Sequence, residues 1–269
     1  MPSIRIAVNG VLGKMGSTVL GAVEADPDLT PVGGVDPRAA SATVDLPGGT
    51  GHVPVYTDVL ACLDATKPDV IVDFTNRDGA LACARAAVAK SVRVVSGSTG
   101  LSPADYDELR KLADSKSVGV ISSTNFALGA VLLMHLASIA SKYFDYADVI
   151  ESHHEQKPDA PSGTALSIVQ AMAAARDSPF RQTVTDKQTL PGTRGGDFKG
   201  INVHSARMPG RVARHEVVFG ALGQTLTMIH DSTSRDSFMP GVMFAVKRVM
   251  AENGLVIGLD AVLGLKQKP

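Results

Sequence analysis

The chain has 269 residues, of which 44 % are hydrophobic, so it can bury one large core or two modest ones. A net charge of −1, with no run rich in Lys and Arg, argues against nucleic-acid and membrane-surface partners. The first residues already follow a strand pattern, without the layout of a signal peptide, and no apolar run reaches ~18 residues. Cys62 and Cys83 are far apart, so we expect reduced core residues in a cytoplasmic protein.

The first half of the chain alternates short apolar runs with helical patterns. Strands are predicted at residues 4–8, 30–35, 69–74, 92–96 and 118–122, and helices at 14–26 and 78–90. A further helix begins at Ser102, which can cap it, with Pro103 in the first turn. This alternation predicts an α/β fold with a parallel, doubly wound sheet.

The pattern changes after Asn125. Helices are predicted at residues 127–141 and 162–176, with a strand at 147–153 between them and a long loop at 177–199. Three strands follow at 201–207, 214–220 and 224–231, the last two joined by a turn at 221–223, before a closing helix at 237–253. We therefore predict an α+β domain at 126–235, inserted into a first domain made of 1–125 and 236–269.

Three glycines follow the first predicted strand, where the chain enters a helix. Gly10, Gly13 and Gly16 let the backbone turn tightly and approach a pyrophosphate, which the helix N-terminus attracts. Leu12 stands where the usual middle glycine would be. Asp36 ends the second strand about 20 residues further on, where an acidic side chain binds ribose hydroxyls. The pattern predicts a dinucleotide site, although a doubly wound domain that binds no nucleotide could carry the same glycines. The residues assigned to it here are Gly10, Val11, Leu12, Gly13, Lys14, Met15 and Asp36.

Two later loops follow predicted strands at the edge where ligands bind in open α/β sheets. They read Ser-Gly-Ser-Thr-Gly at 96–100 and Ser-Ser-Thr-Asn-Phe at 122–126. Each could equally be an ordinary connection between a strand and a helix. The residues predicted to contact the cofactor in these loops are Gly97, Ser98, Thr99, Ser123, Thr124, Asn125 and Phe126.

Residues 151–165 concentrate groups suited to proton transfer near an anion. His153 and His154 can each donate or accept a proton near neutral pH, and Lys157 adds a positive charge. Ser162 can cap a helix, so that the N–H groups of Gly163 and Thr164 can hold a carboxylate.

The histidines could also have purely structural roles. A histidine at the end of a strand is more often a hydrogen-bonded structural residue. Neighbouring strand residues point to opposite faces, so His153 and His154 would rarely ligate one metal ion, and we expect no metal site. His204, His215 and His230 lie in separate strands without metal-ligand spacing, and we assign them no role.

The run E-x-H-H-x-x-K-x-D-A-P-S-G-T-A at 151–165 resembles the signature of the 4-hydroxy-tetrahydrodipicolinate reductase family, also called dihydrodipicolinate reductases. The glycine loop, Asp-Phe-Thr at 73–75, the loops at 97–100 and 125–126, and Ser-Arg-Asp-Ser-Phe at 234–238 are similar to the same family, so the resemblance spans the chain. The chain departs from it at Met208–Pro209, at Ala213–Arg214 and at Pro37, where some members have arginine.

The resemblance implies a two-domain enzyme that uses NADH, NADPH or both to reduce a small dicarboxylate in lysine and diaminopimelate biosynthesis. It also implies a homotetramer built through the second domain. His153 would be the general acid and Lys157 a second proton donor, while His154, Gly163 and Thr164 would bind substrate carboxylates. Because Asp36 repels a 2′-phosphate and Arg38 could offset that repulsion, we expect NADH to be preferred and NADPH to be accepted.

Three other functions would fit parts of this pattern. One is a different dehydrogenase on the same frame, acting on a small amino-acid-derived substrate such as a semialdehyde. Another is a regulator that binds the nucleotide without turnover. The third is a metal-binding module that uses His153 and His154.

Overall fold

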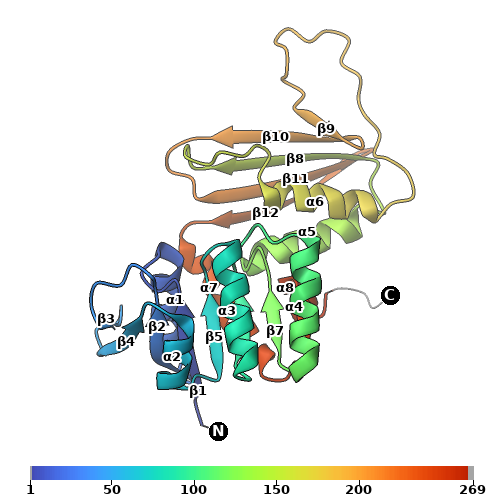
Figure 1. Cartoon of the computed structure of the whole chain (residues 1–269). Coiled ribbons are helices and arrows are strands. Elements are labelled where there is room, and N and C mark those ends of the chain that lie inside the picture. Colours follow the sequence, from blue (N-terminus) through green and yellow to red (C-terminus); the bar gives the residue numbers. More distant parts are fainter. Residues whose placement is uncertain (1, 266–269) are drawn as a thin grey trace. The chain divides into compact units, whose positions relative to one another are not determined.

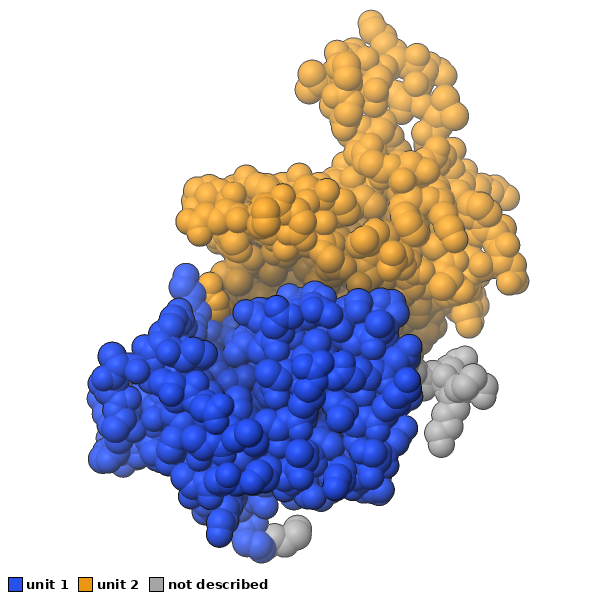
Figure 2. Space-filling view, in the orientation of Figure 1, with its two compact units in different colours: residues 1–126, 238–269 blue, residues 127–237 orange. Residues whose placement is uncertain are grey.

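The computed structural model describes residues 2–265, which divide into two compact units. The first comprises residues up to Phe126 and from Phe238 onward, and the second is Ala127–Ser237 (Figure 2).

The described part of the first unit forms a doubly wound α/β sheet, which confirms the predicted fold class (Figure 1). Its strand order is β13-β7-β6-β5-β1-β2-β4-β3, parallel except where β3 meets β4. The strands are β1 (Ile4–Asn9), β2 (Leu29–Val35), β3 (Thr43–Asp45), β4 (His52–Tyr56), β5 (Val70–Asp73), β6 (Arg93–Ser96), β7 (Val120–Ser122) and β13 (Leu255–Ile257).

Helices cover both faces of this sheet (Figure 1). They are α1 (Lys14–Ala25), α2 (Val59–Thr66), α3 (Arg77–Ala89), α4 (Pro103–Lys116), α7 (Met239–Val249) and α8 (Leu259–Val262). Ser102 caps α4 as predicted: its hydroxyl accepts the N–H of Asp105, whose carboxylate in turn accepts the N–H of Ser102.

Several elements of the first unit differ from the predictions. Between Asp36 and Asp69, where no element is predicted, the chain forms β3, β4 and α2. The predicted closing helix at 237–253 is wrong at both ends, because a 3₁₀ turn at Arg235–Phe238 precedes α7 and the helix stops at Val249. The chain then adds β13 beside β7.

The second unit is a five-stranded sheet with helices α5 (Leu128–Ala140) and α6 (Gly163–Ala174) on one face (Figure 1). The order is β12-β11-β8-β10-β9, in which only β10 and β8 pair in parallel. The strands are β8 (Tyr146–His153), β9 (Gly196–Phe198), β10 (Ile201–Arg207), β11 (Ala213–Ala221) and β12 (Gln224–Ser232). The predicted loop at 177–199 therefore has a strand at its end.

The core of the second unit lies between the sheet and the two helices. Val149 and Val217 are neighbours in register on β8 and β11, both fully buried, and they pack in one cluster with Ile168 of α6. Side chains alternate along a strand. The residues next to Val149 in β8 and next to Val217 in β11 therefore point to the face of the sheet that the helices do not cover.

Candidate active site

A buried row of polar side chains ends the central strands of the first unit. Asn9, Asp73, Ser96 and Ser122 are partners in register on β1, β5, β6 and β7, and each is at most 5 % exposed. The loops that follow these four strands therefore start from one edge of the sheet. This is the carboxyl edge at which open α/β sheets bind ligands.

The glycine loop fits a bound phosphate. Gly10 has φ of +82°, which favours glycine, and a Cβ on Gly16 would stand 2.0 Å from the carbonyl oxygen of Gly10. Helix α1 can therefore begin close against the loop. It begins at Lys14 without a side-chain cap, so the N–H groups of its first turn point toward the space in front of the loop.

The N–H groups earlier in the loop serve the loop itself. Those of Gly10 and Val11 both donate to the carbonyl of Val35, and that of Gly13 donates to Gly10. The Val11 side chain is buried and fills the space that a Cβ on Gly34 would need. Of the predicted cofactor residues here, Lys14 and Met15 are the ones placed to offer backbone N–H groups to a phosphate.

The Asp36 carboxylate is fully engaged by neighbouring donors. One oxygen accepts the backbone N–H and the Nε of Arg38, each at 3.0 Å; the other accepts Nη2 of Arg38 at 3.1 Å and the N–H of Leu12 at 3.3 Å. The hydrogen bond from Arg38 lowers the pKa of Asp36 and outweighs the opposing effect of burial. Arg38 itself is 74 % exposed, so the pair presents a guanidinium to solvent where the sequence indicates a bare carboxylate.

The other two predicted cofactor loops, at residues 96–100 and 122–126, each contain both exposed and buried side chains. Thr99 and Thr124 are exposed, whereas the hydroxyls of Ser98 and Ser123 are buried and bonded within the protein. Phe126 is buried, with its ring centroid 6.1 Å from that of Phe74. Ser123 also accepts the N–H of Leu259, which ties this loop to the C-terminal segment.

A second polar row crosses the sheet of the second unit, on the face that the helices cover. The register sets Glu151 of β8 beside Ser205, His215 and, one strand further, His230. Two positions earlier along β8, the same face carries Val149 in the apolar core. The core therefore changes from apolar to polar side chains just before β8 ends at His153.

Glu151 is fully buried, and its carboxylate accepts hydrogen bonds from Arg207, Ser162, His153 and the Ser205 side chain. Arg207 donates through Nη1 and Nη2 to both carboxylate oxygens, at 3.0 and 2.8 Å; Ser162 donates its N–H at 3.2 Å, and His153 lies at 2.5 Å. Burial raises the pKa of Glu151, but the hydrogen bonds from His153 and Arg207 outweigh it and hold the pKa at about 2. Glu151 is thus an anion at neutral pH, able only to accept hydrogen bonds.

This contact fixes the tautomer of His153. The ring is 91 % buried by side-chain area and its Nδ1 faces the Glu151 carboxylate, so Nδ1 carries a hydrogen. Nε2 is then the nitrogen that gains or loses a proton. The sequence identified His153 but gave no role to Glu151 or Arg207, which set its orientation.

His215 and His230 complete a row of three imidazoles. His215 meets His153 edge to face, with centroids 5.3 Å apart, and is stacked on His230 at 6.5 Å. Its Nε2 lies 3.2 Å from the Ser162 hydroxyl. Burial, followed by the nearby His153, lowers the pKa of His215 to about 4, so this ring is neutral at neutral pH. The sequence assigned neither histidine a role, because only strand register brings them to His153.

The remaining residues of the 151–165 segment lie around the start of α6. Ser162 caps this helix as predicted by accepting the N–H of Ala165. Lys157 pairs with Asp159 at 2.7 Å, and the hydrogen bond from Lys157 lowers the pKa of Asp159, with a smaller effect from the Gly163 N–H. His154 and Gly163 are exposed and Thr164 is half-buried.

Residues 2–265 contain neither a metal-binding cluster nor a membrane-spanning helix. Within residues 2–265, no three His, Cys, Asp or Glu side chains are arranged to hold a metal ion, and His153 is buried whereas His154 is exposed. In the same residues, no helix is long and apolar enough to cross a membrane.

The first unit has the fold of a dinucleotide-binding domain, and the second unit contains a buried carboxylate–histidine pair. This combination is that of a two-domain α/β oxidoreductase. The chain belongs to the dihydrodipicolinate reductase family: the model of that family's N-terminal part matches residues 4–126, and the model of its C-terminal part matches residues 129–263.

Relatives and solved structures agree with this membership. Proteins named 4-hydroxy-tetrahydrodipicolinate reductase are 45 % identical in Dehalococcoides mccartyi, over 98 % of this chain and 100 % of the relative, and 43 % identical in Geobacillus kaustophilus, over 97 % and 99 %. A dipicolinate-bound dihydrodipicolinate reductase from Paenisporosarcina has a TM-score of 0.87 at 36 % identity, covering 96 % of this chain and 99 % of that one. An amine dehydrogenase from Mycobacterium smegmatis, 19 % identical with a TM-score of 0.68 and coverages of 99 % and 98 %, shares the fold alone.

The lowered pKa of His215 predicts acid sensitivity. Its pKa of about 4 lies below the ordinary value of 6.5, so folding favours the neutral ring; this contribution is complete above about pH 6.5 and is lost as the pH falls toward 4. Between pH 7 and pH 5 the loss amounts to about 2 kcal/mol. We expect His215→Gln to show a smaller fall in Tm over this interval than the parent. The exposed His52→Gln is the control, and an equal fall in parent and His215→Gln would contradict the assignment.

Proposed function

We propose that the protein catalyses the NAD(P)H-dependent reduction of 4-hydroxy-tetrahydrodipicolinate to tetrahydrodipicolinate in lysine and diaminopimelate biosynthesis. Members of the family use NAD(P)H, and their N-terminal domain binds the dinucleotide. The observation in the structure that carries the proposal is the buried Glu151–His153 pair, next in the chain to a lysine and a capped helix start that suit a carboxylate. A regulator without turnover would have little use for an oriented proton donor.

The first unit would hold the cofactor at the carboxyl edge of its sheet. The N–H groups at the start of α1 suit the pyrophosphate, Asp36 and Arg38 lie at the end of β2 where the adenosine ribose binds in such folds, and Thr99 is exposed in the loop after β6. NAD(P)H, when bound, supplies the hydride for the reduction. The chain's own task is then to orient the substrate and to deliver a proton.

His153 would deliver that proton. Conversion of 4-hydroxy-tetrahydrodipicolinate to tetrahydrodipicolinate also releases the 4-hydroxyl group as water. Once the ring has lost water, hydride adds to one carbon of the unsaturated imine, and the electron pair left at the neighbouring carbon takes up a proton. Because Nδ1 is held by the Glu151 anion, the transferable proton is the one on Nε2. The buried negative charge stabilises the protonated ring before transfer, and the Arg207 ion pair keeps the carboxylate in place.

Lys157 and the start of α6 would bind the substrate carboxylates, together with His154, Gly163 and Thr164. In the structure, Lys157 forms an ion pair with the carboxylate of Asp159, which also accepts the Gly163 N–H, and this arrangement supports a role in binding carboxylates. A substrate carboxylate would replace Asp159 or share the donors with it. Lys157 would also serve as a second proton donor.

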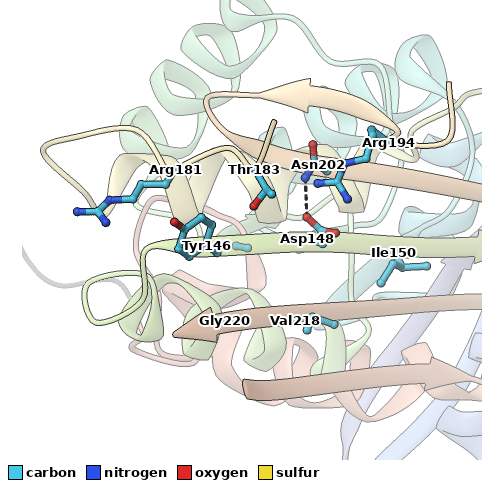
Figure 3. Close-up of a pocket in the computed structure, with 10 residues that line it drawn as sticks. Tyr146, Asp148, Ile150, Arg181, Thr183, Arg194, Asn202, Val218 and Gly220 are labelled. Atoms are coloured by element: carbon cyan, nitrogen blue, oxygen red, sulfur yellow. Dashed lines mark hydrogen bonds between the residues drawn. The ribbon is translucent and has the colours of Figure 1, made fainter. Parts of the chain in front are cut away.

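We further propose a homotetramer in the cytoplasm. On the uncovered face of the second unit's sheet, Tyr146, Ile150 and Ile229 are 40 %, 36 % and 51 % exposed, and the nine-residue β12 is an open edge. A hollow of about 440 Å³ on this face is lined by residues of β8 and β11 together with Arg181, Thr183 and Arg194. Figure 3 labels these residues and shows Arg194 near Asn202 and Asp148. Copies of this chain would cover that face. Analytical ultracentrifugation should give the mass of four chains, and a single-chain mass would contradict the assembly.

The proton-transfer role of His153 is tested by His153→Gln. Loss of a general acid lowers rates by ~10²–10⁴-fold, so we expect kcat to fall in that range while the Kd of NADH stays unchanged. Stopped-flow NADH oxidation with freshly prepared substrate measures the first, and fluorescence titration the second. His52→Gln should behave as the parent. Wild-type kcat in His153→Gln would remove this residue from the mechanism, and no oxidation by the parent with either nucleotide would sink the proposed activity.

Recognition of two carboxylates is tested with inhibitors. A planar aromatic 2,6-dicarboxylate should compete with the substrate, and the matching monocarboxylate should bind much more weakly. Lys157→Ala should raise the inhibition constant of the dicarboxylate about tenfold or more, since a hydrogen-bonded charge pair is lost, and should also lower kcat. Lys142→Ala, an exposed lysine of the same unit, is the control. Equal inhibition by both compounds would argue against a two-carboxylate site.

The Asp36–Arg38 pair makes a prediction about cofactor choice. Asp36 favours NADH because its charge repels a 2′-phosphate, while the exposed guanidinium can attract that phosphate, so we expect NADH to be preferred and NADPH accepted. Arg38→Ala should increase the ratio of kcat/KM for NADH to that for NADPH about tenfold. Arg110→Ala, another exposed arginine, should not change it. A parent that favours NADPH tenfold would overturn the argument from Asp36, and an unchanged ratio in Arg38→Ala would exclude Arg38.

A further inference from the structure

Asp73 is a buried carboxylate whose side-chain partners in the described part of the chain are all neutral. Its side chain is fully buried at the end of β5, yet within residues 2–265 its hydrogen bonds come only from neutral side chains. One oxygen accepts the Asn9 amide at 2.9 Å and the Thr75 hydroxyl at 2.7 Å. The other accepts the hydroxyls of Ser96 and Ser98, both at 2.7 Å. Burying a carboxylate is costly, so a sheet that needed only packing would be served better by an apolar residue here.

The carboxylate dictates the direction of every hydrogen bond around it. Because it can only accept, the three hydroxyls must each donate their hydrogen to it and are left as acceptors toward the loops. The Ser98 hydroxyl accepts the N–H of Thr75 at 2.9 Å, and the Ser96 hydroxyl accepts the N–H of Ser98 at 3.3 Å. The negative charge thus orients hydroxyls that in turn hold the backbone of residues 74–76 and 97–99.

The segment 74–76 also packs directly against the glycine loop on one side and against Gly97 on the other. A Cβ on Gly10 would lie 2.8 Å from the Phe74 carbonyl oxygen and 3.0 Å from the Thr75 methyl carbon, and a Cβ on Gly97 would lie 2.1 Å from the Phe74 ring. A small displacement of Phe74 or Thr75 would therefore move the glycine loop and the loop that carries Thr99. The donors to Asp73 lie at the ends of β1 and β6 and in the loops after β5 and β6, so a single anion sets the spacing of the loops that follow β1, β5 and β6.

We propose that Asp73 is a positioning residue for the dinucleotide, acting through Ser96, Ser98 and Thr75 without touching the cofactor itself. The proposal rests on nucleotide binding by the first unit and is independent of which substrate is reduced. Replacing the carboxylate by an amide would place donors opposite the donors of Asn9, or of Ser96 and Ser98. The loops would then lose their fixed arrangement while the sheet beneath them could still form.

The test compares Asp73→Asn with Asp105→Asn by isothermal titration of the full chain with NADH. Asp105 is the matched control, because it is also a buried carboxylate of the first unit, but it caps α4 and pairs with Arg77. We expect Asp73→Asn to raise the Kd of NADH about tenfold or more, as for the loss of a hydrogen bond to a charged group, and Asp105→Asn to lower Tm without changing that Kd.

A second variant covers the case in which Asp73→Asn does not fold. Ser98→Ala removes one donor to the carboxylate and the acceptor of the Thr75 N–H, and should raise both the Kd of NADH and its KM several-fold while the KM of the substrate stays unchanged. Parent-like Kd values in every Asp73 and Ser98 variant that folds would overturn the proposal and leave Asp73 a structural residue. Failure of the proposed activity would appear separately, as a parent that binds NADH but does not oxidise it.

Discussion

The carboxylate of Glu151 is fully enclosed in the second unit, and its charge constrains everything around it. A buried anion destabilises the fold unless donors satisfy both oxygens, and removing one partner of such a pair is strongly destabilising. Arg207, Ser162 and His153 meet that need, from the end of β10, the start of α6 and the end of β8. One anion therefore fixes three elements at once, and the tautomer of the histidine follows from the same contact.

The first unit solves a similar problem with different chemistry. Asp73 is as deeply buried as Glu151, but its donors are hydroxyls and an amide. None of these donors is a histidine that could pass a proton on to a substrate. The outcome differs accordingly. A carboxylate paired with histidine can support proton transfer, whereas one ringed by hydroxyls fixes loop geometry. Both lie near the ends of central strands, so in each unit the buried face of the sheet changes from apolar to polar side chains where the predicted chemistry lies.

Local signals in the sequence were sufficient to predict several of the features that build these two sites. The cap at Ser102, the glycine loop and the end of β8 at His153 each depend on neighbours in the chain, and each is where the sequence indicates. The contacts that the sequence did not predict depend on pairing between strands that are far apart in the chain. His215 and His230 reach His153 only through the register of β8, β11 and β12, and Arg207 reaches Glu151 through a parallel pairing. The short β4 was missed although Val53 and Val55 alternate with polar neighbours, because Pro54 interrupts its strand pattern.

The central claim is that the Glu151 anion orients His153 and stabilises its protonated form for proton transfer. The most direct test is the pH profile of kcat for Glu151→Gln, with Glu155→Gln, an exposed neighbour, as the control. The account predicts a fall in kcat of about 10²-fold or more and a shift to lower pH of the limb where activity declines with rising pH, with an unchanged Kd for NADH. The position of that limb does not depend on how much of the variant is folded. A profile that coincides with that of the parent, whatever the amplitude, would contradict the claim.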